Sequence, residues 1–209
     1  MKKIKKEYIF ISVLLVLFLI LTMFVVSGKT SILDEKFFGS IIRLENNILT
    51  KVLYTITNIG STLGVIIVLI LLAVLFMRKK SLSDFKYIVS NVGIGVILMK
   101  TLKHIIKRVR PSWKWIVQGG FSYPSGHTIS AILLYGTLIL LVNKKLNSKY
   151  KKYIIIFLST MIFLISISRI YFGVHYLTDV VASLILGSII LVISNMFMNK
   201  EFSSDKNKN

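Results

Sequence analysis

The sequence contains no cysteine, and this absence excludes disulfide bonds, thiolate metal sites and every mechanism that uses a cysteine nucleophile. Proline occurs only twice and glycine 12 times among 209 residues. Little of the chain is therefore suited to flexible linkers, and it shows no internal repeat or low-complexity tract. We predict a single domain that covers residues 1–209.

Acidic residues are scarce as well, because 8 Asp and Glu stand against 27 Lys and Arg, for a formal net charge of +19. Strongly basic chains often bind nucleic acid. Here the basic residues alternate with long apolar segments, 55% of the residues are hydrophobic and the mean hydropathy is +0.76. This pattern indicates a membrane protein whose cations face lipid headgroups, the cytoplasm or an anionic substrate, and it argues against a nucleic-acid partner.

Six apolar runs approach the ~20 residues that a helix needs to cross the hydrocarbon core of a bilayer. They cover about 8–26, 59–77, 86–106, 125–142, 153–169 and 176–198. We therefore predict an all-α, polytopic membrane protein built as a bundle of six transmembrane helices. The third run is interrupted by polar residues, because it contains Lys86, Asn91 and Lys100.

The first run follows the basic start MKKIKKE, which resembles the beginning of a signal peptide. Its apolar part of about 19 residues is longer than a signal-peptide core, and no A-x-A-like cleavage site follows. We expect this first helix to be retained.

Clusters of lysine and arginine predict the orientation of the bundle. They lie in segments 2–6, 78–86, 144–152 and 200–208. With six spans these segments share one side of the membrane, and the positive-inside rule makes that side the cytoplasm. Both termini, including a polar tail at 200–209, are then cytoplasmic, whereas the loops 27–58, 107–124 and 170–175 are extracytoplasmic.

The first extracytoplasmic loop contains SILDEKFFGSIIRLENNIL, in which apolar residues from Ile32 to Leu49 approximate helical spacing on one face. This pattern predicts an amphipathic helix. Two placements are open for it, in the plane of the membrane interface or packed against the bundle.

Before the second loop, Lys103 and Arg110 are seven positions apart, which places them on one helical face, about 20° out of register. Pro111 disfavours helical geometry at Arg110, so we expect the helix to end near that residue and to present two cations at its outer end. Trp113 and Trp115 are typical of interfacial anchors.

The motif PSGH at 124–127 directly precedes the fourth apolar run. Ser125 is a favourable helix N-cap, and the free N–H groups of a first helical turn attract anions. Gly126 lets a ligand approach the backbone, and His127 would face that ligand from the first turn. For an isolated PSGH, a capped helix with an interfacial histidine is the simpler interpretation.

The third loop lies within SRIYFGVHYLTDVV at 168–181. His175 and Asp179 are four positions apart, on one face at the start of the sixth run. A carboxylate that accepts from one ring nitrogen fixes the tautomer and makes the other nitrogen more basic. Arg169 ends the fifth run, and a structural salt bridge between Arg169 and Asp179 is an alternative interpretation.

Together these segments place three cations, a helix N-terminus, two histidines and an orienting carboxylate on one face of the membrane, a combination that suits phosphoryl transfer. The patterns K-x6-RP at 103–111, PSGH at 124–127 and SR-x5-H-x3-D at 168–179 resemble the three signature motifs of the type-2 phosphatidic acid phosphatases. That superfamily also contains the vanadium haloperoxidases. All three motifs match in order and without departure, and the core from 103 to 179 lies within a chain whose six runs fit the family's six-helix membrane bundle.

The resemblance implies a catalytic role for each motif residue. His175 is expected to be the nucleophile that forms a phosphohistidine, with Asp179 holding its imidazole. His127 is expected to protonate the leaving oxygen and later to activate water. The residues expected to hold the phosphoryl oxygens are Lys103, Arg110, Arg169, Ser125 and Gly126.

Neither a metal ion nor another cofactor is expected. A magnesium or two-metal site needs clustered carboxylates, and the acidic residues of the three loops and the nearby helix start, Asp34, Glu35, Glu45 and Asp179, form no ligand cluster in the sequence. Charge stabilisation by the cations and a covalent intermediate would supply the catalysis instead.

The expected substrate is a lipid phosphate, because 12 residues between Pro111 and Pro124 are too few for a soluble lid domain and a lipid can enter sideways. Phosphatidylglycerophosphate, phosphatidate and undecaprenyl diphosphate all fit, with membrane lipids as the surroundings. A lipid phosphotransferase that uses the same phosphohistidine remains an alternative. A haloperoxidase and a non-enzymatic lipid-binding or transport protein are disfavoured by the membrane character and by the complete motifs.

Overall fold

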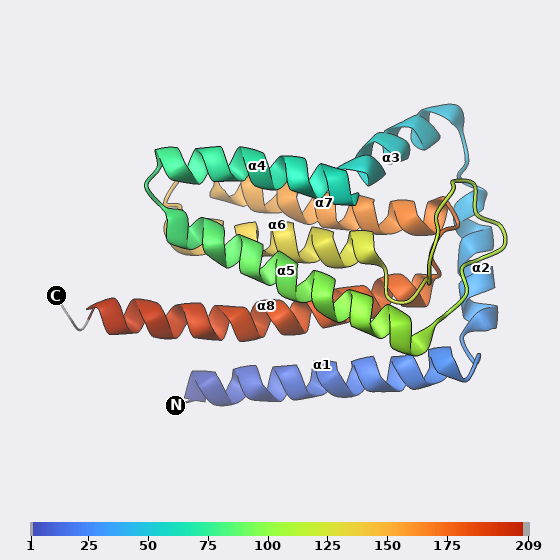
Figure 1. The fold of residues 1–209 in the computed structure, drawn as a ribbon, viewed down its shortest axis with the longest axis horizontal. Coiled ribbons are helices and arrows are strands. Elements are labelled where there is room, and N and C mark those ends of the chain that lie inside the picture. Colours follow the sequence, from blue (N-terminus) through green and yellow to red (C-terminus); the bar gives the residue numbers. More distant parts are fainter. Residues whose placement is uncertain (1, 207–209) are drawn as a thin grey trace.

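Residues 2–206 are described by a computed structural model, and they form eight α-helices and no strand (Figure 1). The helices are α1 (Lys2–Val26), α2 (Ser31–Ile42), α3 (Asn47–Ile59), α4 (Thr62–Arg78), α5 (Leu82–Ile106), α6 (Gly126–Lys145), α7 (Lys151–Tyr171) and α8 (Leu177–Lys206). The predicted all-α class is confirmed. The last three residues of the expected polar tail, 207–209, lie outside the described residues.

Five of these helices, α1 and α5 to α8, are long and apolar enough to cross a membrane. α4 has only 17 residues, but together with α3 it passes the same test as one span bent by 61°. The described chain therefore has five candidate spans, or six if the bent pair counts as one span. The sequence predicts six.

Several helices extend beyond the apolar runs that predicted them. α5 begins at Leu82 rather than near residue 86, α6 continues to Lys145 and α7 begins at Lys151. Lysine side chains have long apolar stems that lie along a helix while the ammonium group reaches polar surroundings. Basic residues at a membrane surface therefore do not end a helix, although they end an apolar run.

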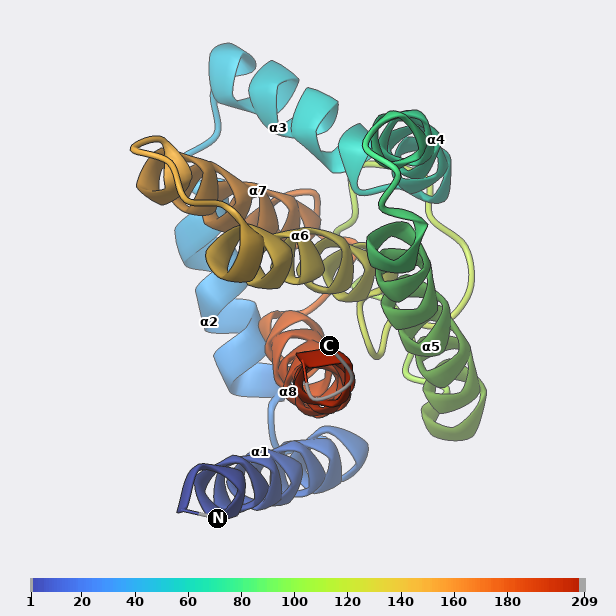
Figure 2. The same ribbon diagram turned by 90° about the vertical axis from the view of Figure 1, so that its left-hand side faces the viewer.

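The helix α6 lies at the centre of the bundle, with α5, α7 and α8 packed around it (Figure 2). α4 lies against α5, α3 against α7, and α1 against α8 on the outside of the bundle. Close packing depends on glycines, because a Cβ atom at Gly95 would overlap Leu133 and one at Gly187 would overlap Ile132. Small residues at these crossings let neighbouring helix backbones approach one another.

The helix α2 lies across one end of the bundle, and both described chain ends lie at the other (Figure 1). We call these the α2 end and the terminal end. α2 contacts α7 and α8, and it buries Asp34 while Ile32 is 68% exposed. The helix thus turns Asp34 inward and apolar side chains outward, which suits a lipid environment.

The prediction of one helix between Ile32 and Leu49 is wrong. Residues 43–46 interrupt it and separate α2 from α3. The side chain of Asn46 caps α3 by accepting from the backbone N–H of Leu49 at 2.8 Å. Of the two placements left open, packing against the bundle is what the contacts of α2 with α7 and α8 show.

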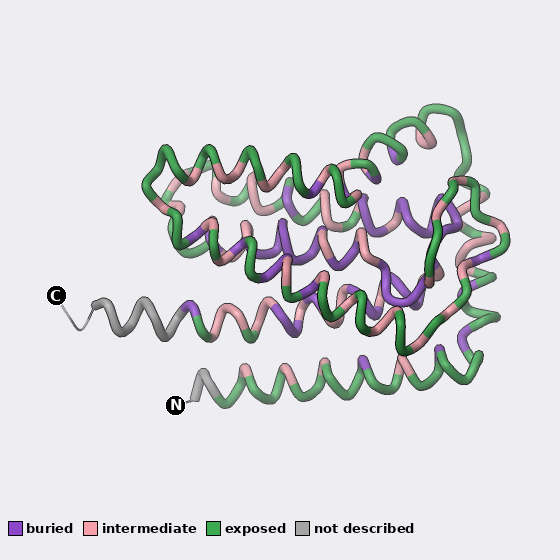
Figure 3. Tube along the Cα trace, viewed as in Figure 1, coloured by how far each residue is buried: buried purple, intermediate pink, exposed green. Residues whose placement is uncertain are grey.

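The segment 107–125 crosses the α2 end and joins α5 to α6, and its last part, 122–125, is buried (Figure 3). α5 ends at Ile106, where Lys107 takes a left-handed conformation with φ of 50°. The turn between α7 and α8 packs closely against this segment. Gly173 in the turn has φ of +62°, and a Cβ atom at this position would overlap Trp113. These contacts bring residues from distant parts of the sequence to one place.

Candidate active site

His175 lies in the short connection between α7 and α8, at the α2 end. Its backbone N–H donates to the carbonyl oxygen of Arg169 at 3.2 Å, as does that of Val174. The carbonyl of Val174 in turn accepts from Nη1 of Arg110 at 2.7 Å. The backbone that carries His175 is therefore held on both sides.

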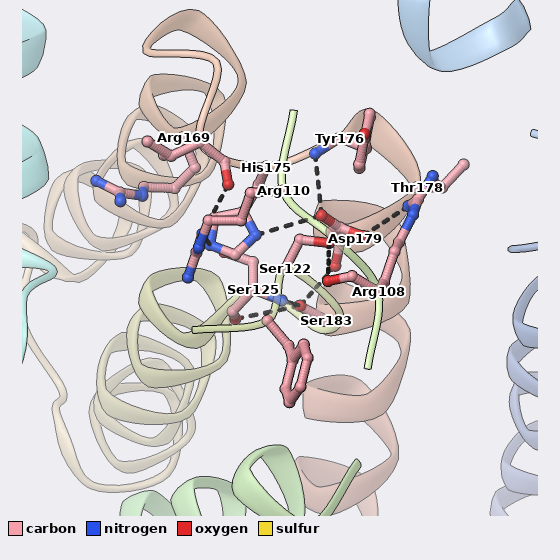
Figure 4. A network of polar contacts seen from close by, with 12 residues as sticks. Arg108, Arg110, Ser122, Ser125, Arg169, His175, Tyr176, Thr178, Asp179 and Ser183 are labelled. Atoms are coloured by element: carbon pink, nitrogen blue, oxygen red, sulfur yellow. Dashed lines mark hydrogen bonds and ion pairs between the residues drawn. The ribbon is translucent and has the colours of Figure 1, made fainter. Parts of the chain in front are cut away.

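The two ring nitrogens of His175 have different partners (Figure 4). Nδ1 lies 3.3 Å from Oδ2 of Asp179, which also accepts from the backbone N–H of Tyr176 at 3.0 Å. Nε2 lies 3.1 Å from Nη1 of Arg110. A guanidinium can only donate, so Nε2 accepts and Nδ1 carries the proton that it donates to Asp179. The contact with Asp179 is the one that the spacing of four residues predicts.

The charge state of His175 follows from its burial. Burial lowers the pKa of His175 to about 3, helped by the charges of Arg110 and Arg169 and opposed by the hydrogen bond and charge of Asp179. The imidazole is therefore neutral near pH 7, with a lone pair on Nε2. This is the form in which a histidine can act as a nucleophile.

A cavity of about 430 Å³ opens beside His175. Of the predicted site residues, those on its wall are Lys103, Arg110, Gly126, His127 and His175. Much of the remaining wall is apolar and comes from α4 and α5, including Val65, Leu69, Val92 and Val96. The cavity thus has a cationic part at the α2 end and an apolar part between α4 and α5, an arrangement that suits an amphiphilic anion.

Backbone carbonyls hold two of the cations on the cavity wall, Lys103 and Arg110. Nζ of Lys103 donates to the carbonyl oxygens of Phe121 at 2.6 Å and Ser122 at 3.2 Å. Nε of Arg110 donates to those of Gly119 and Gly120 at 3.1 and 3.0 Å. Burial lowers the pKa of Arg110, and the charge of Asp179 opposes this shift. The loop carbonyls therefore stabilise cations that the cavity partly desolvates.

Arg110 reaches the cavity by a route that differs from the expected one. The sequence predicts Lys103 and Arg110 on one helical face, but α5 ends four residues before Arg110. The left-handed residue Lys107 turns the chain, and Arg110 approaches from the loop. The two cations are brought together as predicted, whereas the shared helical face is wrong.

Arg169 lies next to the cavity rather than on its wall, and it is only 1% exposed. Nη1 donates to Oγ1 of Thr57 at 2.6 Å, and Nη2 donates to Oε1 of Gln118 at 3.1 Å. Its Nε is buried without a hydrogen-bond partner, and Gln118 lies on the cavity wall. Gln118 therefore lies between the Arg169 guanidinium and the cavity. A guanidinium with an unpaired buried N–H group so close to the cavity suits a site that receives an anion.

The expected alternative of a salt bridge between Arg169 and Asp179 is wrong. Among the described residues, the partner that forms an ion pair with Asp179 is Arg108, with Nη1 2.6 Å from Oδ1. Nη2 of Arg108 lies 2.7 Å from Oδ2 of Asp34 on α2. Burial works against the charge of Arg108, but the charges and hydrogen bonds of Asp179 and Asp34 outweigh it and raise the pKa of its guanidinium.

The PSGH residues divide between two roles. Ser125 is the N-cap residue of α6 as predicted, but its hydroxyl accepts from Oγ1 of Thr128 at 3.1 Å and does not cap the helix. Its backbone N–H donates to Oγ of Ser183 at 2.8 Å, so Ser125 ties α6 to α8 and lies off the cavity wall. Gly126 and His127 line the cavity. The phosphate-binding role of Ser125 stays a prediction.

His127 occupies the first turn of α6, as predicted, and its ring forms no hydrogen bond with another described residue. Its Cδ2 lies 3.5 Å from where a Cβ atom of Gly60 would stand, at the bend between α3 and α4. The bend therefore packs against the histidine without covering its nitrogens with polar groups.

Trp113 and Trp115 pack against aromatic residues around the loop. Trp113 stacks on Phe38 of α2 with ring centroids 5.0 Å apart, and Trp115 contacts Tyr171 edge-on at 5.6 Å. They hold the 107–125 segment to α2 and α7, whereas the sequence predicts interfacial anchors.

Four residues near the site were not predicted from the sequence: Asp34, Thr57, Arg108 and Gln118. A carboxylate among the apolar residues of α2, at Asp34 or the adjacent Glu35, was a usable signal, because burying either one requires a partner. Arg108 has no comparable signal, since the sequence around it is rich in cations. No group of three His, Asp or Glu side chains that could hold a metal ion occurs in residues 2–206. The independence from metals stays a prediction.

The fold and this site define a class of protein: a helical membrane protein with a histidine, an orienting carboxylate and several cations around an amphiphilic cavity. The model of the PAP2 superfamily matches residues 85–203, which is more than half of the chain. The chain therefore belongs to the PAP2 superfamily, as the three motifs predict.

Individual relatives are similar over most of their length. The chain is 32% identical over 192 residues to phosphatidylglycerophosphatase B of Bacillus subtilis (strain 168), covering 90% of this chain and 94% of that protein. The crystal structure of a transmembrane PAP2-type phosphatidylglycerolphosphate phosphatase from Bacillus subtilis matches with a TM-score of 0.82 and 29% identity, covering 91% of this chain and 96% of that one. The structure of Aquifex aeolicus LpxE has the same fold, with a TM-score of 0.65 at 24% identity over 78% of this chain and 95% of that one.

The chain is therefore a multi-pass membrane protein and a lipid phosphatase of the PAP2 type, which is a hydrolase. The family and the enzyme class that the sequence predicts are both confirmed.

Proposed function

We propose that this lipid phosphatase hydrolyses phosphatidylglycerophosphate through a covalent phosphohistidine on His175. One observation carries the mechanism: Nδ1 of His175 is held by Asp179, whereas Nε2 faces Arg110 beside the cavity. This arrangement leaves one nitrogen lone pair for attack and supports the imidazolium formed when it attacks.

The reaction then has two steps. Nε2 of His175 attacks the terminal phosphorus, a P–N bond forms, and the bond to the leaving oxygen breaks while His127, in its protonated form, donates a proton to that oxygen and becomes neutral. In the second step His127 takes a proton from water, the water oxygen attacks phosphorus, and the P–N bond breaks to release phosphate. Arg110 leaves Nε2 to bind a phosphoryl oxygen, and Lys103 and Arg169 supply further positive charge.

A third cation on the cavity wall, Lys100, supports the choice of substrate. Lys100 lines the same wall as Lys103, one helical turn nearer the terminal end, about 4.5 Å along the axis of α5. Its side chain forms no hydrogen bond or ion pair with another described residue. Phosphatidylglycerophosphate carries a second phosphate between its terminal phosphate and its acyl chains, so Lys100 lies where that second charge would pass. The similarity to phosphatidylglycerophosphatase B of Bacillus subtilis agrees with this choice.

Phosphate release by the purified protein in detergent tests the proposal, with phosphatidylglycerophosphate, phosphatidate and undecaprenyl diphosphate as substrates and EDTA in every assay. We expect the highest kcat/KM for phosphatidylglycerophosphate, no requirement for added metal, and loss of turnover in His175→Ala. Activity that vanishes in EDTA and returns with Mg²⁺ would contradict the metal-independent mechanism. An added acceptor lipid that gains the phosphoryl group would identify a phosphotransferase.

The variant Lys100→Gln distinguishes phosphatidylglycerophosphate from phosphatidate as substrates. Removing this charge is expected to raise KM about tenfold for phosphatidylglycerophosphate and to leave the KM for phosphatidate within about threefold, because phosphatidate has no second phosphate. Equal increases for both lipids would contradict the assignment of Lys100.

The orientation also belongs to this proposal. We infer that the α2 end is extracytoplasmic and that both termini are cytoplasmic, because the basic segments 2–6, 78–86 and 144–152 lie toward the terminal end. A topology reporter inserted in 112–120 should report the extracytoplasmic side, and a cytoplasmic signal there would reverse the assignment.

A further inference from the structure

Arg108 occupies an unspecified position within the K-x6-RP motif, yet it lies between two buried carboxylates. Its Nη1 is 2.6 Å from Oδ1 of Asp179, and its Nη2 is 2.7 Å from Oδ2 of Asp34. The ring of Tyr176 covers the guanidinium, with the centroid 3.9 Å from Cζ. Asp34 is 1% exposed and Asp179 is fully buried, so Arg108 is the cation that compensates both charges.

The contacts of Asp179 show what Arg108 does for His175. One carboxylate oxygen, Oδ2, accepts from the His175 ring and from the backbone N–H of Tyr176. The other, Oδ1, accepts from Arg108. Because donors hold both oxygens, the carboxylate plane cannot rotate, and Oδ2 stays directed at Nδ1 of His175 (Figure 4).

Asp34 holds Arg108 in this place from α2. Both of its oxygens accept from Thr178, with the backbone N–H at 3.0 Å and the hydroxyl at 3.1 and 2.9 Å. Nη1 of Arg108 also donates to the Thr178 hydroxyl at 2.8 Å. Thr178 precedes Asp179 in the first turn of α8, so α2, the 107–125 segment and α8 meet at one buried cluster.

We propose that Arg108 is a positioning residue, which sets the orientation of Asp179 and thereby the reactive tautomer of His175, and that Asp34 of α2 keeps Arg108 in place. This proposal rests on the proposed role of His175 as the nucleophile. Without the guanidinium, the buried carboxylates of Asp34 and Asp179 would repel each other, and Asp179 would lose the donor on Oδ1. The helix α2 then contributes to catalysis although it lies off the cavity wall.

A structural role alone makes a different prediction from a positioning role. If Arg108 only fastened α2, its loss would lower stability and its effect on turnover would not depend on Asp179. If Arg108 acts through Asp179, removing Arg108 should not lower kcat any further in a variant that already lacks the Asp179 carboxylate. A double-mutant cycle between the two residues separates these roles.

The experiment measures kcat and KM with phosphatidylglycerophosphate for the purified full chain carrying Arg108→Gln, Asp179→Asn or both. We expect Arg108→Gln to lower kcat about 10- to 100-fold with KM within about threefold. In the Asp179→Asn background the same change should alter kcat by less than about threefold. Arg108→Lys, which keeps a cation but cannot contact both carboxylates with one fork, should recover part of the loss. Arg43→Gln, an exposed arginine at the end of α2, is the matched control and should retain the wild-type kcat.

Three results would overturn the proposal: wild-type kcat in Arg108→Gln, losses that multiply in the double variant, or a KM effect without a kcat effect. If Arg108→Gln does not fold, Asp34→Asn gives a second test, with an expected loss in kcat of about three- to tenfold that also disappears in the Asp179→Asn background. Turnover by His175→Ala would refute the nucleophile. An inactive His175→Ala beside a fully active Arg108→Gln would refute the positioning role alone.

Discussion

The α2 end and the terminal end of the bundle each contain carboxylates paired with cations, but the surroundings differ. At the terminal end Asp84 pairs with Lys145 at 2.6 and 2.7 Å, and the lysine side chain is 37% exposed. At the α2 end the carboxylates of Asp34 and Asp179 are buried around Arg108. The first pair joins α5 to α6 near the membrane surface, whereas the second belongs to a cluster that reaches His175.

This difference shows where the molecule accepts the cost of buried charge. Desolvating a charge is expensive, and an apolar pair of similar size often stabilises a protein equally well. The core between the two ends is almost entirely apolar, with Asn91 donating to Thr137 at 3.0 Å as a buried polar contact. Most of the buried charged side chains of the described residues lie at the α2 end, and Asp84 is the exception at the terminal end.

The largest expected effect comes from the centre of the α2 end. His175→Ala removes the proposed nucleophile, so kcat should fall by about 10⁴-fold or more. Steady-state phosphate release measures it, and trapping of acid-labile, ³²P-labelled protein should show label in the wild type and none in the variant. His104→Ala, which removes an exposed histidine beside Phe121, is the matched control and should keep most of the activity. Label on His175→Ala would place the covalent intermediate elsewhere.

A pair of equivalent substitutions compares the two ends directly. Asp179→Asn keeps the size of the side chain but favours the wrong tautomer of His175, and kcat should fall by about 10²- to 10⁴-fold. Asp84→Asn at the terminal end should leave kcat within about threefold, because a partly exposed ion pair contributes little. Kinetics together with thermal unfolding in detergent measure both. Similar losses of kcat in the two variants would mean that the ends do not differ in function.

An alanine in place of Gly60, at the bend between α3 and α4, should reduce activity more than an alanine in place of Gly93 in α5. A Cβ atom in Gly60→Ala would lie 2.5 Å from Cγ2 of Ile165 and would push the bend away from His127, so we expect kcat to fall about threefold to tenfold. Gly93→Ala meets no atom within 4 Å and should leave activity unchanged while stabilising the helix slightly. Equal activity of the two variants would show that the bend does not position His127.

The smallest expected effect is on the pH dependence of stability. Burial lowers the pKa of His175 to about 3, below the ~6.5 of an unfolded chain, so between these values only the unfolded state binds the proton. This group therefore destabilises the fold as pH falls from 7 toward 4. The thermal midpoint of the wild type should drop more between pH 7.5 and pH 5 than that of His175→Asn. A steeper drop in the variant would contradict the buried neutral histidine.

Local patterns were sufficient for most of the membrane helices and for the pairing of His175 with Asp179. Both depend on residues close in the chain, through apolar periodicity and a spacing of four. The bent pair of α3 and α4 was harder, because the apolar run at 59–77 does not show that the preceding helix joins it at an angle. Helix ends were misplaced where lysines continue a helix beyond its apolar run.

The residues missed were those whose role comes from distant contacts. Arg108 meets Asp34 and Asp179 across 74 and 71 positions, and Arg169 meets Thr57 across 112. No local pattern distinguishes Arg108 from the neighbouring Lys107, whereas Arg110 is marked by the K-x6-RP motif. The alternative pairing of Arg169 with Asp179 was wrong for the same reason, since charge alone does not tell which cation packs beside which carboxylate.

The sequence by itself determined the membrane character, the apolar segments that cross it and the motif residues that a PAP2 phosphatase carries, because each is expressed in composition or in short spacings. Only the tertiary structure decided that α2 turns Asp34 inward and that Arg108 rather than Arg169 holds Asp179. It also decided that Arg110 reaches His175 from a loop. Hydrogen bonds are short and directional, so the partners of a buried charge are selected by how the helices pack rather than by their order in the chain.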